Sequence, residues 1–129
     1  MDRSEIEAFV KRLYAARVDG DVQALGQAFA DNATFHIAGS PENSILATFA
    51  EGHGEVMGLI QTMVDTFGLE DFTILELLID GDKAAVRWRA TVNQFGAGRS
   101  FETELADFIE IENGKVVSFV EFLDTAAAG

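Results

Sequence analysis

The chain has 129 residues, of which 48% are apolar, with a mean hydropathy of +0.13 and no cysteine. This composition favours a single folded domain over residues 1–129 and excludes disulfides and thiolate chemistry. The net charge of −13 argues against nucleic acid and anionic membranes as partners, and the lack of a ~20-residue apolar run or a signal peptide predicts a cytoplasmic protein.

The first half of the chain predicts three helices, one short strand and a long loop. Ser4, with Glu7 three residues on, fits a capping box, and the apolar stripe of this first helix ends at Arg17. The long loop carries apolar residues, which favours a lid. We expect helices at about 4–19, 22–29 and 54–67, the strand at 33–38 and the loop at 39–52.

The second half changes to a period of two, which is typical of strands. Short turns rich in Gly, Asn and Asp separate the apolar runs and predict a meander. Three helices followed by a curled antiparallel sheet make an α+β architecture. Apolar residues also mark the outer sheet face, which predicts a homodimer through the sheet. The expected strands are residues 72–80, 83–95, 101–112 and 115–124.

Three stretches resemble the nuclear transport factor 2-like superfamily, and within it the SnoaL-like and ketosteroid-isomerase-like proteins. They are GDVQALGQAFADNATFHI (20–37), EGHGEVMGLI (51–60) and DFIEIENGKVVSFVEFLD (107–124). The resemblance implies a cone-shaped α+β barrel with three N-terminal helices packed on a curved, mostly antiparallel sheet. That scaffold hosts isomerases, epoxide hydrolases, polyketide cyclases, dehydratases and binding domains, so the fold does not settle the activity.

The catalytic set of ketosteroid isomerase is only partly matched. Its carboxylate base falls at Ile37, and its tyrosine falls at Leu13, with Tyr14 one place along. Its oxyanion-binding aspartic acid is matched by Asp107. The resemblance therefore implies that the acid position is matched but that the base that shuttles the proton is missing.

The water site of limonene-epoxide-hydrolase-like enzymes is also only partly matched. Their Arg-x-Asp pair falls at Trp88 and Ala90, and their Tyr and Asn fall at Phe35 and Ile37. Their last Asp is matched by Glu121. The resemblance thus implies the fold rather than either specific activity.

Asp107 is the strongest candidate that the residue pattern itself provides. It lies on the apolar face of strand 101–112, and a four-residue turn at 96–99 predicts that it pairs with Trp88. Loss of hydration there would raise its pKa above ~3.9, as a general acid or oxyanion donor requires. The competing interpretation is a structural aspartate bonded to a helix end or to Tyr14.

Glu121 is the second candidate, and its face depends on the turn at Asn113-Gly114. A strict two-residue turn pairs Asp107 with Val120, whereas a three-residue turn with a bulge pairs Asp107 with Glu121. In the second case two carboxyl groups share one apolar cavity and titrate together. With the two-residue turn, Glu121 is instead a surface residue near the mouth of the cavity.

Apolar side chains are expected to wall the pocket. Trp88 is expected either to line the pocket or simply to pack in the core. Tyr14 is expected to contact a ligand or Asp107, or to be an ordinary core residue. With no cysteine, His36 facing off the pocket and His53 over the lid, no metal or cofactor site is expected. Arg87 and Arg89 are expected to pair with acidic neighbours outside the pocket. The other expected substrate-binding residues are Phe35, Ile37, Leu105 and Phe119.

These features support two classes of function. The first is an isomerase, cyclase or lyase that acts on a small apolar, polyketide-like or steroid-like substrate, with Asp107 and Glu121 as acid and base. The second is a non-catalytic module that binds a hydrophobic ligand, or a dimeric interaction domain whose pocket is filled. The partners expected are a small apolar ligand and a second copy of the chain.

Overall fold

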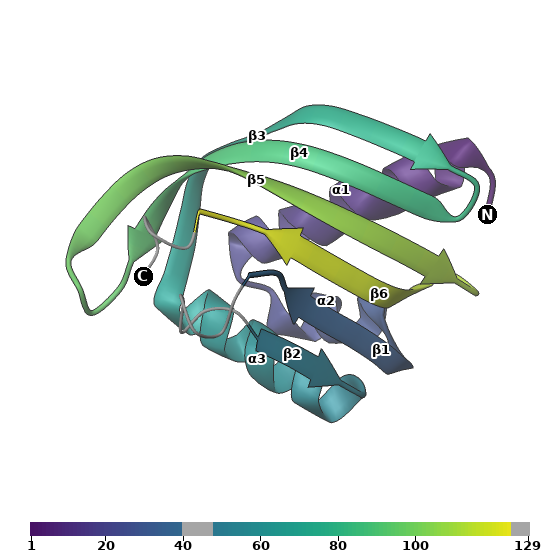
Figure 1. The fold of residues 1–129 in the computed structure, drawn as a ribbon, viewed down its shortest axis with the longest axis horizontal. Helices are drawn as coiled ribbons and strands as arrows, with labels where there is room; N and C mark the ends of the chain where they lie inside the picture. The colour runs from purple at the N-terminus through teal and green to yellow at the C-terminus, as the bar shows by residue number, and fades with distance from the viewer. Residues whose placement is uncertain (40–47, 125–129) are drawn as a thin grey trace.

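The computed structural model describes residues 1–39 and 48–124, which form three helices and six strands. The helices lie on the concave side of one curved sheet, so the predicted α+β class is confirmed (Figure 1). In chain order the elements are α1 (Arg3–Asp19), α2 (Val22–Ala28), β1 (Phe29–Ile37), β2 (Thr48–Glu51), α3 (His53–Thr66), β3 (Phe67–Asp80), β4 (Lys83–Gln94), β5 (Arg99–Glu112) and β6 (Lys115–Phe122).

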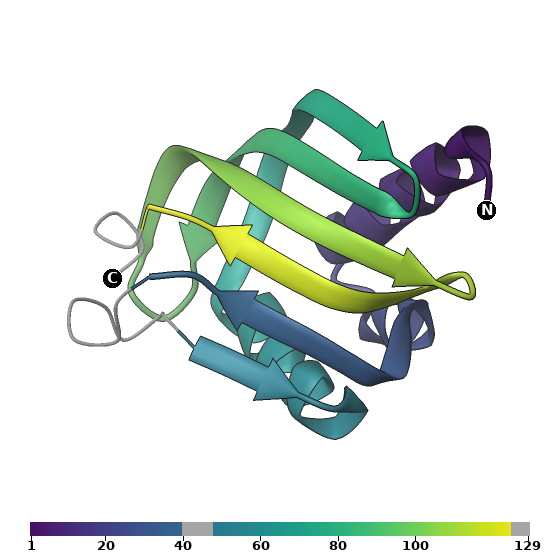
Figure 2. The same ribbon diagram turned by 45° about the vertical axis from the view of Figure 1, so that its right-hand side comes forward.

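The sheet is mixed and has the strand order β2-β1-β6-β5-β4-β3. Only the β1–β6 pair is parallel; all other neighbouring strands are antiparallel. The long hairpin of β4 and β5 bends over the helices (Figure 2), and register shifts between β3 and β4 accompany this curvature. The sheet curls around its core without closing, with β2 and β3 as its edges.

Helix α1 begins two residues earlier than a Ser4 cap predicts. Asp2 is the N-cap: its carboxylate accepts the backbone N–H of Glu5 at 2.8 Å, and the Glu5 side chain accepts the N–H of Asp2 at 3.1 Å. The pairs Asp2/Glu5 and Ser4/Glu7 both fit the capping-box spacing, and the earlier pair extends the helix. The Ser4 prediction was therefore wrong, although the buried stripe of the helix is as expected.

Two element boundaries also differ from the prediction. Phe29, expected at the end of the second helix, is the first residue of β1, and Phe67 begins β3 directly after α3. The expected loop 39–52 contains β2, which pairs antiparallel with β1. Residues 40–47, on which the lid interpretation depends, lie outside the described residues.

Asp107 pairs with Val86 rather than with Trp88, because Gln94 and Arg99 form the last pair of the β4–β5 hairpin. The predicted register was therefore wrong by two residues. A shift of two preserves the face of every side chain, since side chains alternate along a strand. Asp107 and Trp88 accordingly remain on the inner face.

Glu121 pairs directly with Asp107. The two-residue turn at Asn113-Gly114 is present, with both residues at positive φ (51° and 76°). The register shifts after Ile111, so that Val116 pairs with Ile111 while Ser118 pairs with Glu110. This bulge changes the phase of β6 and turns Glu121 inward.

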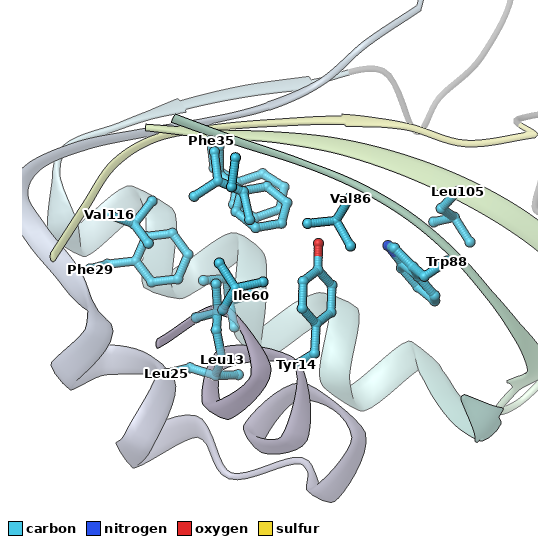
Figure 3. Packing of buried hydrophobic residues seen from close by; sticks show 14 of the residues in the cluster. Leu13, Tyr14, Leu25, Phe29, Phe35, Ile60, Val86, Trp88, Leu105 and Val116 are labelled. Atoms are coloured by element: carbon cyan, nitrogen blue, oxygen red, sulfur yellow. The ribbon is translucent and has the colours of Figure 1, made fainter. Parts of the chain in front are cut away.

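The core lies between the concave face of the sheet and the helices. Figure 3 shows Leu13 and Tyr14 of α1 and Ile60 of α3 beneath Phe35 and Val86 of the sheet. Among the described residues, none of the helices combines the length and the hydropathy that crossing a membrane requires.

Candidate active site

An apolar cavity of about 510 Å³ lies inside the curved sheet. Its walls come from α1, α2, α3 and all six strands, so chain segments far apart in sequence meet around it. A volume of this size is within the range of small-molecule sites. Of the residues that the sequence singled out, Tyr14, Phe35, Ile37, Trp88, Leu105, Phe119 and Glu121 line it.

Asp107 lies directly behind this wall and does not line the cavity itself. Its side chain is completely buried, with 0% exposure. Its Oδ2 accepts hydrogen bonds from the Trp88 indole N–H at 2.7 Å and from the Tyr14 hydroxyl. In Figure 3 the Tyr14 hydroxyl and the Trp88 nitrogen both point toward the space beneath Val86, the residue that pairs with Asp107.

Burial raises the pKa of Asp107 to about 6, and hydrogen bonds from Glu121, Tyr14 and Trp88 limit that rise. Burial, with the charge of Asp107, also raises the pKa of the Tyr14 hydroxyl well above its usual range. Tyr14 is therefore a hydrogen-bond donor at neutral pH, and Asp107 is the acceptor. The bond to Tyr14 that the sequence offered as a structural role for Asp107 is present.

Glu121 brings a carboxyl group to the cavity wall itself, with 5% exposure. Burial raises its pKa well above the usual range, and the neighbouring Asp107 charge raises it further. The charge of Arg17 acts in the opposite direction. Two neighbouring buried carboxyl groups resist double ionisation, and the hydrogen bonds that Asp107 accepts from Tyr14 and Trp88 favour Glu121 as the protonated member of the pair.

The two carboxyl groups are coupled in their ionisation. Asp107 Oδ2 already accepts two hydrogen bonds, and Oδ1 is buried without a fixed donor among the described residues. The Glu121 and Asp107 side chains interact, and this interaction lowers the pKa of Asp107 and raises that of Glu121. A proton on Glu121 would give Asp107 Oδ1 the donor that it lacks.

Arg17 was not predicted as a site residue, yet it lines the cavity. Its guanidinium donates to the backbone oxygen of Phe67 at 2.8 Å. Burial lowers its pKa, and the charge of Glu121 opposes that effect. The signal in the sequence was a cation four residues after Leu13 on the buried stripe of a helix, where an apolar residue is expected.

Gln94 is the second residue that the sequence reasoning missed. It lines the cavity at the end of β4, and its Oε1 is buried without a hydrogen-bond partner in the described part of the chain. The signal was an amide at the end of an alternating apolar series. That series consists of Ala84, Val86, Trp88, Ala90 and Val92, all buried.

The two histidines lie away from the carboxyl pair. His36 contacts the ring of Phe49 and is not in the cavity wall. A ring nitrogen of His53 is hydrogen-bonded to the backbone oxygen of Gly26 at 2.8 Å, so it links α3 to α2. The lid over which His53 was expected depends on residues 40–47, outside the described residues. Residues 1–39 and 48–124 contain no cluster of three metal-binding side chains.

Arg87 and Arg89 form ion pairs outside the cavity, as predicted. Arg87 approaches Glu104 at 3.4 Å and Glu76 at 3.6 Å, and Arg89 approaches Glu102 at 3.8 Å. All five side chains are about half exposed or more, so these pairs contribute little to stability. They mark the outer face of the sheet as the solvated one.

Comparison with known families gives one match that spans most of the chain. A family model described as SnoaL-like domain matches residues 10–119. No functionally curated protein matches the sequence. The matched range includes α1 from its buried middle onward and all the strands up to Phe119.

Solved structures share the fold. A nuclear transport factor 2-like protein from Burkholderia xenovorans is 26% identical, with a TM-score of 0.77 over 98% of this chain and 95% of that one. An epoxide hydrolase of the limonene-epoxide-hydrolase-like type from M. tuberculosis is 15% identical, with a TM-score of 0.77 over 95% and 85%. A ketosteroid-isomerase-like protein from Catenulispora acidiphila, in complex with trimethylamine, is 18% identical, with a TM-score of 0.72 over 88% and 82%.

Proposed function

The chain belongs to the SnoaL-like domain family, and from that premise we propose that it is an enzyme that processes a small apolar substrate in this cavity by carboxyl acid–base catalysis. Glu121 is the catalytic acid, because it is the member of the carboxyl pair that lines the cavity. The observation that carries the proposal is the buried carboxyl group of Glu121 in the wall of an apolar cavity, where burial raises its pKa well above the usual range.

Asp107 is a positioning residue in this proposal. It accepts the Glu121 proton when the cavity is empty and thereby fixes the orientation of the acid. Tyr14 and Trp88 in turn hold Asp107 from two other elements, α1 and β4. A group held in this way needs little reorganisation when a substrate arrives.

The chemistry that fits is proton transfer to and from a carbonyl compound. Glu121 donates its proton to the carbonyl oxygen, and the resulting carboxylate removes a proton from a neighbouring carbon of the same molecule. These two transfers convert the ketone into its enol and leave Glu121 protonated. In an isomerisation Glu121 then delivers its proton to another carbon of the enol and takes the enol O–H proton in return. In a cyclisation the enol carbon attacks a second carbonyl, whose oxygen takes a proton from Glu121 while the enol O–H proton returns to Glu121. Arg17 supplies positive charge near Glu121 while that carboxyl group is ionised.

Epoxide hydrolysis is supported less well. The M. tuberculosis neighbour is described as an epoxide hydrolase, but at this identity the likeness concerns the fold alone. The positions at which the resemblance expects Arg and Asp carry Trp88 and Ala90 here. An isomerase, cyclase or lyase of an apolar ketone therefore fits these residues better.

The second candidate function is binding of a hydrophobic ligand without turnover. The observation that favours it is the enclosure of Asp107, which already bonds Tyr14 and Trp88 and does not reach the cavity. A carboxyl pair that only joins strands to a helix would produce the same contacts. The two candidate functions differ in whether the wild-type protein converts a bound ligand into product.

The test compares Glu121→Gln with Glu104→Gln, a matched control on the solvated face. Trp88 is the single tryptophan and lines the cavity, so its fluorescence reports ligand binding. Wild type is assayed with β,γ-unsaturated steroid ketones and with poly-β-ketone esters that cyclise by aldol reaction. Turnover is followed by absorbance and mass spectrometry.

We expect Glu121→Gln to lower kcat by about 10²- to 10⁴-fold, with a change in ligand Kd below about threefold. Glu104→Gln should match wild type. Retained turnover in Glu121→Gln contradicts the assignment of the acid. Binding of these ketones by wild type without turnover of any of them favours the second candidate.

A homodimer through the outer face of the sheet belongs to the same proposal. Phe108 and Phe122 contact each other there and are 52% and 49% exposed, and Leu78 is 59% exposed. Exposed apolar groups of this size are typical of interfaces. Light scattering should give twice the chain mass for wild type and the chain mass for Phe108→Asp; a monomeric wild type contradicts the dimer.

A further inference from the structure

Two buried side-chain atoms in the described part of the chain lack a hydrogen-bond partner, Asp107 Oδ1 and Gln94 Oε1. For the first, the neighbouring carboxyl group of Glu121 can supply a donor when it is protonated. Nothing in the described chain accounts for the second. Buried polar atoms are nearly always paired, so an unpaired acceptor in a cavity wall indicates where a ligand places a donor.

The position of Gln94 in the fold makes its amide unusual. Gln94 continues the inward-facing series of β4, whose preceding members are all buried and, apart from the indole N–H of Trp88, apolar. An apolar side chain would continue this pattern without cost. Burying an amide oxygen without a partner costs on the order of 1–3 kcal/mol, which a bound ligand with a donor would offset.

Gln94 and Glu121 line the cavity from different strands, β4 and β6. Glu121, Asp107 and Val86 form one row across β6, β5 and β4, because Asp107 pairs with both of the others. From Val86 to Gln94 the contour of β4 is about 26 Å at the usual rise of a strand. The hairpin bends (Figure 2), so this contour is an upper limit on the distance from Val86 to Gln94. Phe67, the partner of Gln94 in β3, accepts a hydrogen bond from Arg17, whose charge acts on Glu121.

We propose that Gln94 is a second polar anchor of the cavity, and that the ligand is an apolar molecule with an O–H or N–H donor that reaches the Gln94 amide oxygen. This inference rests on the proposed function, which places the reacting end of the ligand at Glu121. Apolar walls between the two anchors hold the body of the molecule, among them Trp88, Val92 and Leu105. Gln94 thereby selects hydroxylated ligands over deoxygenated or etherified ones.

The experiment measures the affinities of two probes of equal length, 1-decanol and 1-methoxynonane. Both carry one oxygen on an apolar chain, but only the alcohol has a donor. Titration of Trp88 fluorescence gives both Kd values for wild type, Gln94→Met, Glu121→Gln and Gln61→Met. Methionine keeps the length of glutamine without the acceptor, and Gln61 is an exposed glutamine of α3 outside the cavity wall.

In wild type the alcohol should bind about tenfold more tightly than the ether, which is the effect of one hydrogen bond to an otherwise unpaired buried acceptor. Gln94→Met should reduce this ratio to about one, mainly by weakening the alcohol. Gln61→Met should keep it. A ratio near one in wild type, a ratio unchanged by Gln94→Met, or no binding of either probe up to its solubility would overturn the inference.

The Glu121→Gln variant separates this inference from the proposed function. Retention of the alcohol preference in Glu121→Gln, with loss of ketone turnover, supports both. Retention of turnover in Glu121→Gln contradicts the catalytic role and leaves the Gln94 ratio as an independent result. A wild-type preference for the ether that Gln94→Met abolishes would show that the amide presents its nitrogen, and would overturn the donor assigned to the ligand.

Discussion

Asp107 and Glu121 lie directly opposite each other on neighbouring antiparallel strands, both buried, and only Glu121 reaches the cavity. Two carboxyl groups this close cannot both ionise easily, so one of them keeps its proton. Tyr14 and Trp88 donate hydrogen bonds to Asp107, and these bonds favour its charged form. This difference in environment assigns one carboxyl group as acceptor and the other as acid.

The pH dependence of turnover should follow from this pair. The active form has Asp107 ionised and Glu121 protonated. We expect kcat to rise as pH increases through about 6, where Asp107 ionises, and to fall at higher pH as Glu121 loses its proton. A profile measured from pH 4.5 to pH 9.5 checks this, and a flat profile or a monotonic fall from pH 5 contradicts it.

Stability should decrease with pH because both carboxyl groups hold their protons more tightly in the folded chain. In the unfolded chain they ionise near pH 4, so above that pH the folded state binds more protons and the free energy of unfolding falls. Each retained proton contributes about 1.4 kcal/mol per pH unit to this fall. Glu121→Gln removes one such proton.

Urea unfolding of Glu121→Gln between pH 5 and pH 7 should therefore show a slope shallower than that of wild type by about that amount. Glu104→Gln, whose carboxyl group is about half exposed, is the control and should keep the wild-type slope. Equal slopes for wild type and Glu121→Gln would show that Glu121 is ionised in the folded protein.

Tyr14→Phe should destabilise the protein at neutral pH. The phenyl ring keeps the stack on Phe72, with centroids 5.4 Å apart, but removes a hydrogen bond to a buried charge. We expect a loss of about 1–3 kcal/mol at pH 8 and a smaller loss at pH 5, where Asp107 is protonated. Urea unfolding at both pH values measures it, and an equal loss at both would show that the hydroxyl does not stabilise the carboxylate.

Asp107→Asn should lower the pKa of Glu121. The substitution removes the negative charge that raises this pKa, and the Asn amide can donate to an ionised Glu121 while its oxygen accepts from Tyr14 and Trp88. Carboxyl ¹³C chemical shifts of Glu-labelled protein report the titration directly. An unchanged or higher Glu121 pKa in the variant would mean that the two groups do not share a proton.

The sequence alone was sufficient for the class of fold and for the inner face of the sheet. Alternation along residues 101–112 assigned Asp107 to the apolar side, and that assignment survived an error of two residues in the predicted pairing. Periodicity is a local property, so it can be read without knowing which strand is the neighbour. The long hairpins and the helix order follow from the same local signals.

The tertiary structure decided which carboxyl group meets the cavity. The phase of β6 depends on one bulge beyond the Asn113-Gly114 turn, and alternation by itself allowed Val120 or Glu121 to face inward. Asp107 is kept from the cavity by Tyr14, 93 residues away in the chain. Such contacts depend on how α1 packs under the sheet, which no local pattern encodes.

The same reason explains Arg17 and Gln94, which the sequence showed only as polar interruptions of apolar series. A polar residue at the end of a buried face has two interpretations: it lies at the solvated end of its helix or strand, or it lines a cavity. The local sequence does not distinguish between them. The tertiary structure separates them here, because the end of β4 and the last turn of α1 both line one cavity. The sequence determined which residues are polar and on which face of each element they lie. The packing of helices against the sheet determined that these residues line a cavity.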